Sequence, residues 1–127
     1  MTTVTAAVIE RDGRILICRR RADQQHPGKW EFPGGKLEPG EEPAACLRRE
    51  LREELAIDAS IGAEITRYRY QYPGRAEIQL IFYRVTEFEG EPDYSHFGEV
   101  CWAKRNELPR FDFLDGDVEF VAELARS

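Results

Sequence analysis

The sequence is poor in cysteine and histidine. Its 127 residues include only three cysteines and two histidines. Cys18, Cys46 and Cys101 lie far apart in apolar or helical stretches, so they form neither a disulfide framework nor a zinc-binding pattern. His26 and His96 also lack partners at the spacing of a zinc site. We expect three unpaired thiols, as is usual in a reducing cytoplasm.

Long apolar runs are also missing. No segment approaches the roughly 20 consecutive apolar residues that a membrane-spanning helix requires. The first residues, MTTVTAAVIERDGRIL, carry no basic stretch of the kind that opens a secretory signal. We therefore expect a soluble, cytoplasmic protein with no membrane partner.

Positive charge is in deficit. The formal net charge is −6 at pH 7, and the pI is near 5.0. Proteins that bind polymeric nucleic acids depend on dense lysine and arginine to release counterions. This balance excludes a nucleic acid polymer as the partner, and any nucleotide bound here is expected to be a small molecule accompanied by a metal ion.

The pattern along the chain predicts one domain over residues 1–127, since no repeat or linker divides it. Asp12-Gly13 is a strong hairpin turn signal, and Pro73-Gly74 marks a second turn. The strands expected from apolar and β-branched runs are 3–9, 14–18, 64–72, 77–88 and 100–103. A mixed sheet flanked by two helices, an α+β arrangement, is the natural layering.

The last helix is expected over residues 117–126. Apolar residues recur there at helical spacing, and they are Val118, Val121, Ala122 and Ala125. Asp115 or Asp117 is placed to cap its first turn.

The first helix carries an unusual acidic face. With about 100° per residue, Leu47, Leu51 and Leu55 share one face that a core would bury. Three glutamates, Glu50, Glu53 and Glu54, line the next arc. The simplest interpretation of such an arc alone is a solvated helix face, which is common in a chain that is 33% charged.

The cations of this helix do not neutralise that arc. Arg48 and Arg52 fall on the far side, and only Arg49, four residues before Glu53, reaches it. We therefore expect Glu50 and Glu54 to be an unrelieved like-charged pair, which disfavours the helix. A bound Mg²⁺ or Mn²⁺ would reverse this, because such ions take carboxylate and carbonyl oxygens together with substrate phosphates.

The same segment resembles the Nudix hydrolase box, G-x5-E-x7-R-E-U-x-E-E-x-G-U with U aliphatic. The matching residues are Gly35, Glu41, Arg49, Glu50, Leu51, Glu53, Glu54 and Ile57. The one departure is Ala56 in place of the last glycine. Because a left-handed conformation costs an alanine about 1–2 kcal/mol, we expect a locally different helix exit there. The resemblance continues through the preceding WEFPGGKLE segment and covers essentially the whole chain.

The resemblance implies the Nudix fold, an α/β/α sandwich with a mixed sheet, and hydrolysis of a diphosphate linkage in a nucleotide. It assigns Mg²⁺ or Mn²⁺ to three glutamates and a backbone carbonyl, which are Glu50, Glu53, Glu54 and the carbonyl of Gly34. Arg49 would orient the carboxylates. Glu50 is favoured as the base that takes the proton from the attacking water, with Glu53 as the alternative.

Several Nudix members recruit one more acidic ligand from the loop before the tryptophan-containing strand. By its spacing from Trp102, the matching position is His96, and Glu99 nearby is the alternative metal ligand.

Within the family, the segment ICRRRADQQHPGKWEFPGGKLEPGEEP looks most like the MutT-type branch, which converts nucleoside triphosphates to monophosphates and pyrophosphate. That likeness implies phosphate contact by Arg20, a nucleoside pocket at Phe32, and base recognition by Asp117. Arg75 in the second hairpin turn is expected to approach the base. The remaining substrate contacts implied are Gly35 and Lys36.

Two substrates remain open within that branch. One is an oxidised purine such as 8-oxo-dGTP, which overall likeness favours, and the other is CTP or 5-methyl-dCTP. Other Nudix hydrolases act on ADP-ribose or dinucleotide polyphosphates, and a non-catalytic nucleotide-binding module would lack box carboxylates that are present here. The expected protein is a monomer or homodimer.

Overall fold

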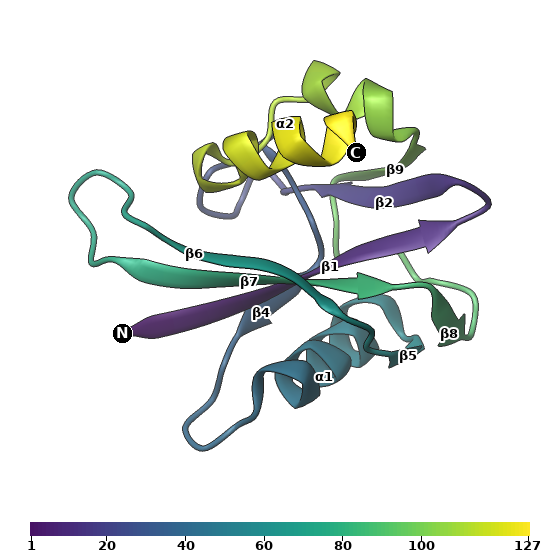
Figure 1. Cartoon of the computed structure of the whole chain (residues 1–127), viewed down its shortest axis with the longest axis horizontal. Helices are drawn as coiled ribbons and strands as arrows, with labels where there is room; N and C mark the ends of the chain where they lie inside the picture. Colours follow the sequence, from purple (N-terminus) through teal and green to yellow (C-terminus); the bar gives the residue numbers. More distant parts are fainter.

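A mixed β-sheet runs through the molecule, with α1 against one face and α2 against the other (Figure 1). The computed structural model describes all residues 1–127. The strands are β1 (Thr2–Arg11), β2 (Arg14–Arg19), β3 (Trp30–Glu31), β4 (Gly34–Lys36), β5 (Asp58–Ser60), β6 (Glu64–Tyr70), β7 (Ile78–Val85), β8 (Glu87–Glu89) and β9 (Glu99–Ala103). The helices are α1 (Pro43–Leu55) and α2 (Val118–Arg126), with short 3₁₀ helices η1 (Arg105–Arg110) and η2 (Asp115–Asp117). This is the α+β fold with a mixed sheet that the sequence predicts.

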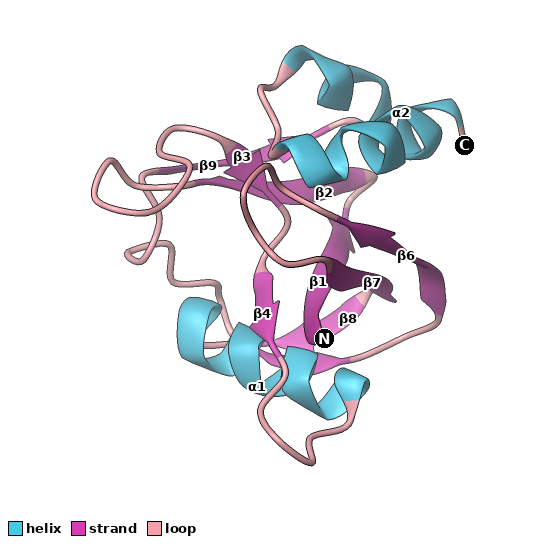
Figure 2. Cartoon of the chain, turned by 90° about the vertical axis from the view of Figure 1, so that its left-hand side faces the viewer, coloured by secondary structure: helices cyan, strands magenta, loops and turns pink.

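Strand β1 is the centre of the sheet. It pairs in parallel with β7 from Thr2 to Ile9. Its other edge is shared, because β4 pairs with residues 4–6 and β2 pairs with residues 10–11. The predicted turn at Asp12-Gly13 joins β1 to β2, and both residues have positive φ angles, as a tight hairpin turn requires. The division of this edge brings β4 close to α1 (Figure 2).

The second predicted hairpin is confirmed as β6 and β7, but its second strand is shorter than expected. β7 ends at Val85, where its pairing with β1 stops. Residues 87–89 then form β8, which pairs with β5 in a separate two-stranded sheet. Phe88 packs against the apolar cluster under α1, and this packing draws the segment away from the main sheet.

Two apolar cores occupy the two faces of the sheet. Leu47, Leu51 and Leu55 of α1 are fully buried, as predicted. On the α2 side, the predicted face is partly wrong. Val118 is 51% exposed, whereas Phe120, Val121 and Leu124 are buried. The larger Phe120 and Leu124 side chains remove more apolar surface from water, so they determine which face of α2 turns inward.

The ends of the two helices also differ from expectation. Asp117 occupies the position before α2, yet its side chain makes no capping hydrogen bond, and Asp115 instead lies 3.9 Å from the Lys29 ammonium. At the end of α1, Ala56 adopts φ 57° and ψ 33°, and its N–H bonds to the carbonyl of Arg52. The expected different exit is therefore wrong, because the alanine adopts the left-handed conformation despite its cost. Neither helix has the length and apolar character needed to cross a bilayer.

Candidate active site

Glu50 lies directly over Gly35, which together with Gly34 begins strand β4 rather than forming the expected turn. A methyl group added at Gly35 would lie 2.4 Å from the carboxyl carbon of Glu50, closer than any real contact. One added at Gly34 would lie 2.0 Å from the carbonyl oxygen of Thr5. The two glycines are therefore required by the close packing of β4 against β1 and α1, and this packing brings the backbone of β4 next to the acidic arc.

Arg49 is the arginine that binds several glutamates of the box at once. Its guanidinium donates to Glu41 at 2.7 Å, to Glu50 at 3.0 Å and to Glu53 at 3.3 Å. It also donates to the carbonyl of Lys36 at 3.3 Å. The hydrogen bond from Arg49 holds the pKa of Glu41 at about 2. The prediction that Glu50 is unrelieved is therefore wrong, because Arg49 curls back along the helix and reaches it.

Glu54 has no cation beside it. Its only hydrogen bond comes from the N–H of Gly34, at 3.2 Å. Burial, followed by the charges of Glu50 and Glu31, raises the pKa of Glu54 to about 8. Arg49 compensates the carboxylates on its side of this corner, whereas Glu54 has no cation to compensate its charge when it ionises.

The donor set of this corner suits a hard divalent cation. It consists of carboxylate oxygens and backbone carbonyls, and it holds an excess of negative charge that such a cation would neutralise. No three acidic, histidine or cysteine side chains converge on one point, because Arg49 holds Glu41, Glu50 and Glu53 on its own side. These carboxylates and carbonyls are chemically suited to a divalent cation, but their side chains do not converge on one point in this structure.

Glu31 is a further buried acidic residue near the site, and the sequence pattern did not predict its role. It lies on β3 opposite Cys18 and forms an ion pair with Arg20 at 2.9 Å. Its side chain is 17% exposed, and burial raises its pKa. A charged residue between Trp30 and Phe32, in an otherwise aromatic strand, was the available signal.

Asp117 is the third acidic residue coupled to this group. It is 6% exposed, has no side-chain cap, and its pKa is raised to about 7 by burial and then by Glu31. The charge of Glu31 raises the pKa of both Asp117 and Glu54. Glu31 is therefore electrostatically coupled to both of the other carboxyl groups, and Arg20 is the cation that pairs with it.

Two tyrosines fix the backbone beside Asp117. The Tyr72 hydroxyl accepts the N–H of Gly116 at 3.0 Å, and the Tyr68 hydroxyl donates to the Gly116 carbonyl. The ring of Tyr72 also lies 5.0 Å from that of His26, in the loop after β2. These contacts hold Asp117 between the β6–β7 hairpin and the β2–β3 loop.

Other predicted residues are not gathered with the carboxylates. Phe32 is 4% exposed and stacks on Phe113 in the core on the α2 side. Arg75 is exposed beyond the end of β6. Glu99 pairs with Arg19 at 3.3 Å, and His96 is exposed, with its carbonyl 3.5 Å from Arg21. The structure therefore brings neither Glu99 nor His96 to the box carboxylates.

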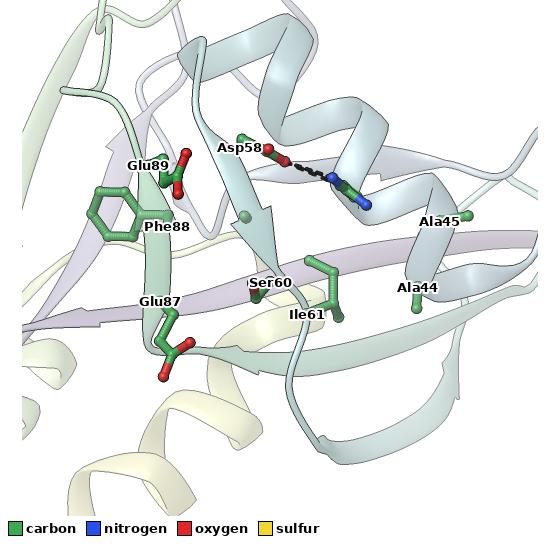
Figure 3. A pocket seen from close by; sticks show the side chains of 10 residues that line it. Ala44, Ala45, Asp58, Ser60, Ile61, Glu87, Phe88 and Glu89 are labelled. Carbon is green, nitrogen blue, oxygen red and sulfur yellow. Dashed lines mark hydrogen bonds and ion pairs between the residues drawn. The ribbon is translucent and has the colours of Figure 1, made fainter.

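A groove beside α1 lies on the side of the helix away from the glutamates. It encloses about 490 Å³ between α1 and the small β5–β8 sheet. Figure 3 shows Ala44 and Ala45 of α1 on one side and Ser60, Glu87 and Glu89 of the sheet on the other. None of the box glutamates lines it, so this groove is separate from the candidate active site.

Comparisons with known proteins agree with this geometry. The NUDIX domain family matches residues 1–124. CTP pyrophosphohydrolase of Escherichia coli strain K12 is 37% identical over 121 residues, which are 95% of this chain and 89% of that protein. The 8-oxo-dGTP diphosphatase of the same strain is 36% identical over 115 residues, 91% of this chain and 88% of that protein.

Among solved structures, that of the E. coli ORF135 protein superposes with a TM-score of 0.85 at 36% identity, covering 96% of this chain and 86% of that one. The family match spans nearly the whole chain, and the relatives are named for diphosphate hydrolysis in nucleotides. The box residues on α1, the Gly34-Gly35 pair on β4 and these matches together show that the chain belongs to the Nudix hydrolase family and is a nucleotide pyrophosphohydrolase.

Proposed function

We propose that this enzyme is a divalent-metal-dependent nucleoside triphosphate pyrophosphohydrolase whose substrate is an oxidised purine nucleotide, 8-oxo-dGTP. Water attacks a phosphorus atom of the triphosphate, a phosphoanhydride bond breaks, and the products are the nucleoside monophosphate and pyrophosphate. The observation that carries the proposal is the electrostatic coupling of Glu31 both to Glu54, in the acidic corner of α1 and β4, and to Asp117, a buried carboxyl group without a side-chain partner.

The helix corner is the phosphate end of the site. The groups that would hold Mg²⁺ or Mn²⁺ are Glu50, Glu53, Glu54 and the carbonyl of Gly34. When bound, such an ion neutralises phosphate oxygens and lowers the pKa of water. Arg20, held by Glu31 at 2.9 Å, supplies a guanidinium for the phosphate chain.

Glu50 is the base that accepts the proton from water. Burial raises its pKa despite the opposing hydrogen bond from Arg49, and a raised pKa makes a carboxylate a better proton acceptor. Glu53 is more accessible, with a side chain that is 58% exposed, and is the alternative base. Arg49 acts by orienting both carboxylates.

Asp117 is the group that reads the base. As a carboxylate it only accepts hydrogen bonds, so it suits an edge rich in N–H donors. Guanine offers N1–H and the N2 amine, and oxidation at C8 adds N7–H. Its burial strengthens such bonds, because a hydrogen bond is electrostatically stronger where the local dielectric is low.

A cytosine nucleotide, CTP or 5-methyl-dCTP, is the second candidate, and the titration of Asp117 favours it. With a pKa of about 7, part of Asp117 is protonated at neutral pH. A carboxylic acid donates one hydrogen bond and accepts another, which matches N3 and the N4 amine of cytosine. The relative named CTP pyrophosphohydrolase is consistent with this reading.

The test is pyrophosphate release with Mg²⁺ from 8-oxo-dGTP, dGTP, CTP, dCTP and 5-methyl-dCTP, with ADP-ribose and a diadenosine polyphosphate in the same panel. A clear preference for 8-oxo-dGTP over dGTP supports the proposal. Preference for the cytosine nucleotides selects the second candidate. Cleavage of ADP-ribose or the dinucleotide without pyrophosphate release contradicts both, and activity that survives chelation contradicts the metal assignment.

A further inference from the structure

Thr5 is a buried polar residue in an otherwise apolar stretch of β1. It has no exposed surface, and with Asp117 it makes up the buried polar residues of the chain other than cysteine. Its neighbours Ala6, Ala7 and Val8 are all buried and apolar. Burying a hydroxyl is unfavourable unless it finds a hydrogen-bond partner, so the contacts of Thr5 indicate what it does.

The Thr5 hydroxyl contacts strand β4 at Gly35, the residue beneath Glu50. It donates to the carbonyl of Gly35 at 3.3 Å. The thiol of Cys46, on the first turns of α1, lies 3.5 Å from the same hydroxyl and 3.8 Å from the same carbonyl. A hydroxyl and a thiol from two different elements thus meet at one backbone oxygen of β4, the strand between β1 and α1 (Figure 2).

The Cys46 thiol also contacts Arg49, the arginine that binds the glutamates of the box. Nη2 of Arg49 lies 3.8 Å from the Cys46 sulfur, and this nitrogen also donates to Glu41 at 2.9 Å. Contacts therefore run without a break from Gly35 through Thr5 and Cys46 to Arg49. One end of this series of contacts is the carbonyl of Gly35, one residue after Gly34, and the other end is the guanidinium that holds Glu50 and Glu53.

We propose that Thr5 and Cys46 are positioning residues that fix the Gly34-Gly35 segment of β4 against Arg49 and so set the affinity of the box for a divalent cation. The inference rests on the proposed metal dependence. Neither residue is a metal ligand. Removing a residue that supports the ligands of a metal site without binding the metal itself commonly weakens metal affinity by about 10–100-fold.

The test is the affinity of the full-length protein for Mn²⁺ alone, followed by electron paramagnetic resonance of the free ion, without nucleotide. Thr5→Val keeps the shape of the side chain and removes the hydroxyl, and it is expected to weaken Mn²⁺ binding about 10-fold. Thr5→Ser keeps the hydroxyl and is expected to bind as the wild type does. In activity assays, Thr5→Val should lower kcat at limiting Mg²⁺ and leave the nucleotide KM unchanged.

The matched control is Thr3→Val, the same change two residues earlier on β1. The Thr3 hydroxyl contacts Gln79 rather than the Gly35 carbonyl of β4, so its loss is expected to leave Mn²⁺ affinity unchanged. Cys46→Ala and Cys46→Ser provide a second pair that does not depend on how well Thr5→Val folds, with weaker binding expected for alanine and restored binding for serine.

The outcomes separate the inference from the proposed function. If the wild type does not bind Mn²⁺, the metal dependence of the proposed function is wrong. If the wild type binds Mn²⁺ and both Thr5→Val and Cys46→Ala bind it equally well, the metal site stands and the positioning role is overturned. Weakening by Thr3→Val as large as that by Thr5→Val would also overturn it.

Discussion

Glu41 and Glu54 show how two carboxyl groups of one site acquire opposite properties. Glu41 accepts two hydrogen bonds from the guanidinium of Arg49, and its pKa is lowered to about 2. Glu54, on the other side of the arc, faces only other carboxylates and the N–H of Gly34, and its pKa is raised to about 8. The position of a single arginine thus decides which side of the corner attracts a cation.

Glu53→Gln is expected to leave folding intact and reduce turnover by about 100-fold or more. Glu53 is more than half exposed and contacts only Arg49, so the free energy of unfolding should change by less than about 0.5 kcal/mol. Steady-state kinetics with saturating Mg²⁺ and thermal melting measure the two effects. Glu123→Gln, on the exposed face of α2, is the control. Unchanged metal-dependent activity in Glu53→Gln would contradict its place in the site.

Asp117→Asn is expected to alter the ranking of bases more than the rate on the best one. Asparagine both donates and accepts but does not titrate. In the wild type, the ratio of cytosine to oxidised-guanine turnover should fall as pH rises through about 7, the pKa of Asp117, because the acid form disappears. In the variant this ratio should stay constant. Competition assays at several pH values check this, and a constant ratio in the wild type would count against base reading by Asp117.

Long elements were predictable from the sequence, and short ones were not. The α1 helix follows from its leucine spacing, and β1, β2, β6 and β7 follow from β-branched runs and turn residues. Strands β3, β4, β5 and β8 have only two or three residues each, too few for a periodic pattern. Their positions depend on pairing with distant segments, so local sequence contains little information about them.

Ala56→Gly is expected to stabilise the fold by about 1 kcal/mol. Ala56 ends α1 in the left-handed conformation, which glycine adopts without the steric cost. Its side chain is exposed, so no packing is lost. Chemical denaturation measures the change. Ala45→Gly, at an exposed position inside the same helix, should instead destabilise by about 0.5–1 kcal/mol, and stabilisation by both substitutions would refute this account.

Gly35→Ala is expected to keep the fold and lower kcat by about 100-fold. The added methyl would lie 2.4 Å from the carboxyl carbon of Glu50, so the Glu50 side chain must move away from β4. Kinetics and circular dichroism measure the two properties. Gly40→Ala is the control, because a methyl there meets nothing within 4 Å and strains only the backbone. Full activity in Gly35→Ala would show that Glu50 need not lie over β4.

At the scale of the whole molecule, the site is assembled from segments that are far apart in sequence. Glu50, Glu53 and Glu54 share one helix, so their relation was predictable from spacing. The charge of Glu31 raises the pKa of Asp117 only because β3 and the segment before α2 come together, with a bridge between Trp30 and Phe113. That proximity is a property of the tertiary fold, and no local pattern contains it.

Stability is expected to fall as pH rises from about 5.5 to 8.5. Glu54 and Asp117 have pKa values of about 8 and about 7 in the folded protein, whereas in an unfolded chain both ionise near pH 4. The folded state therefore binds more protons across this window, and raising the pH favours unfolding. Calorimetry should show a lower Tm at the higher pH.

The double variant Glu54→Gln/Asp117→Asn should have a smaller dependence of Tm on pH in that window. Added Mg²⁺ should raise the Tm of the wild type most at the upper end, where Glu54 is ionised. A Tm that rises with pH between these values would contradict the assignment of the two buried acids.

The parallel pairing of β1 with β7 has a consequence for the order of folding. β1 is synthesised first, but its partner ends at Val85, so most of the chain must leave the ribosome before the sheet can close around its centre. Contacts that close such long loops slow folding, and until then the apolar strand is exposed to other chains. We expect nascent chains that stop before β7 to need chaperone protection, while the hairpin of β1 and β2 waits for its third strand.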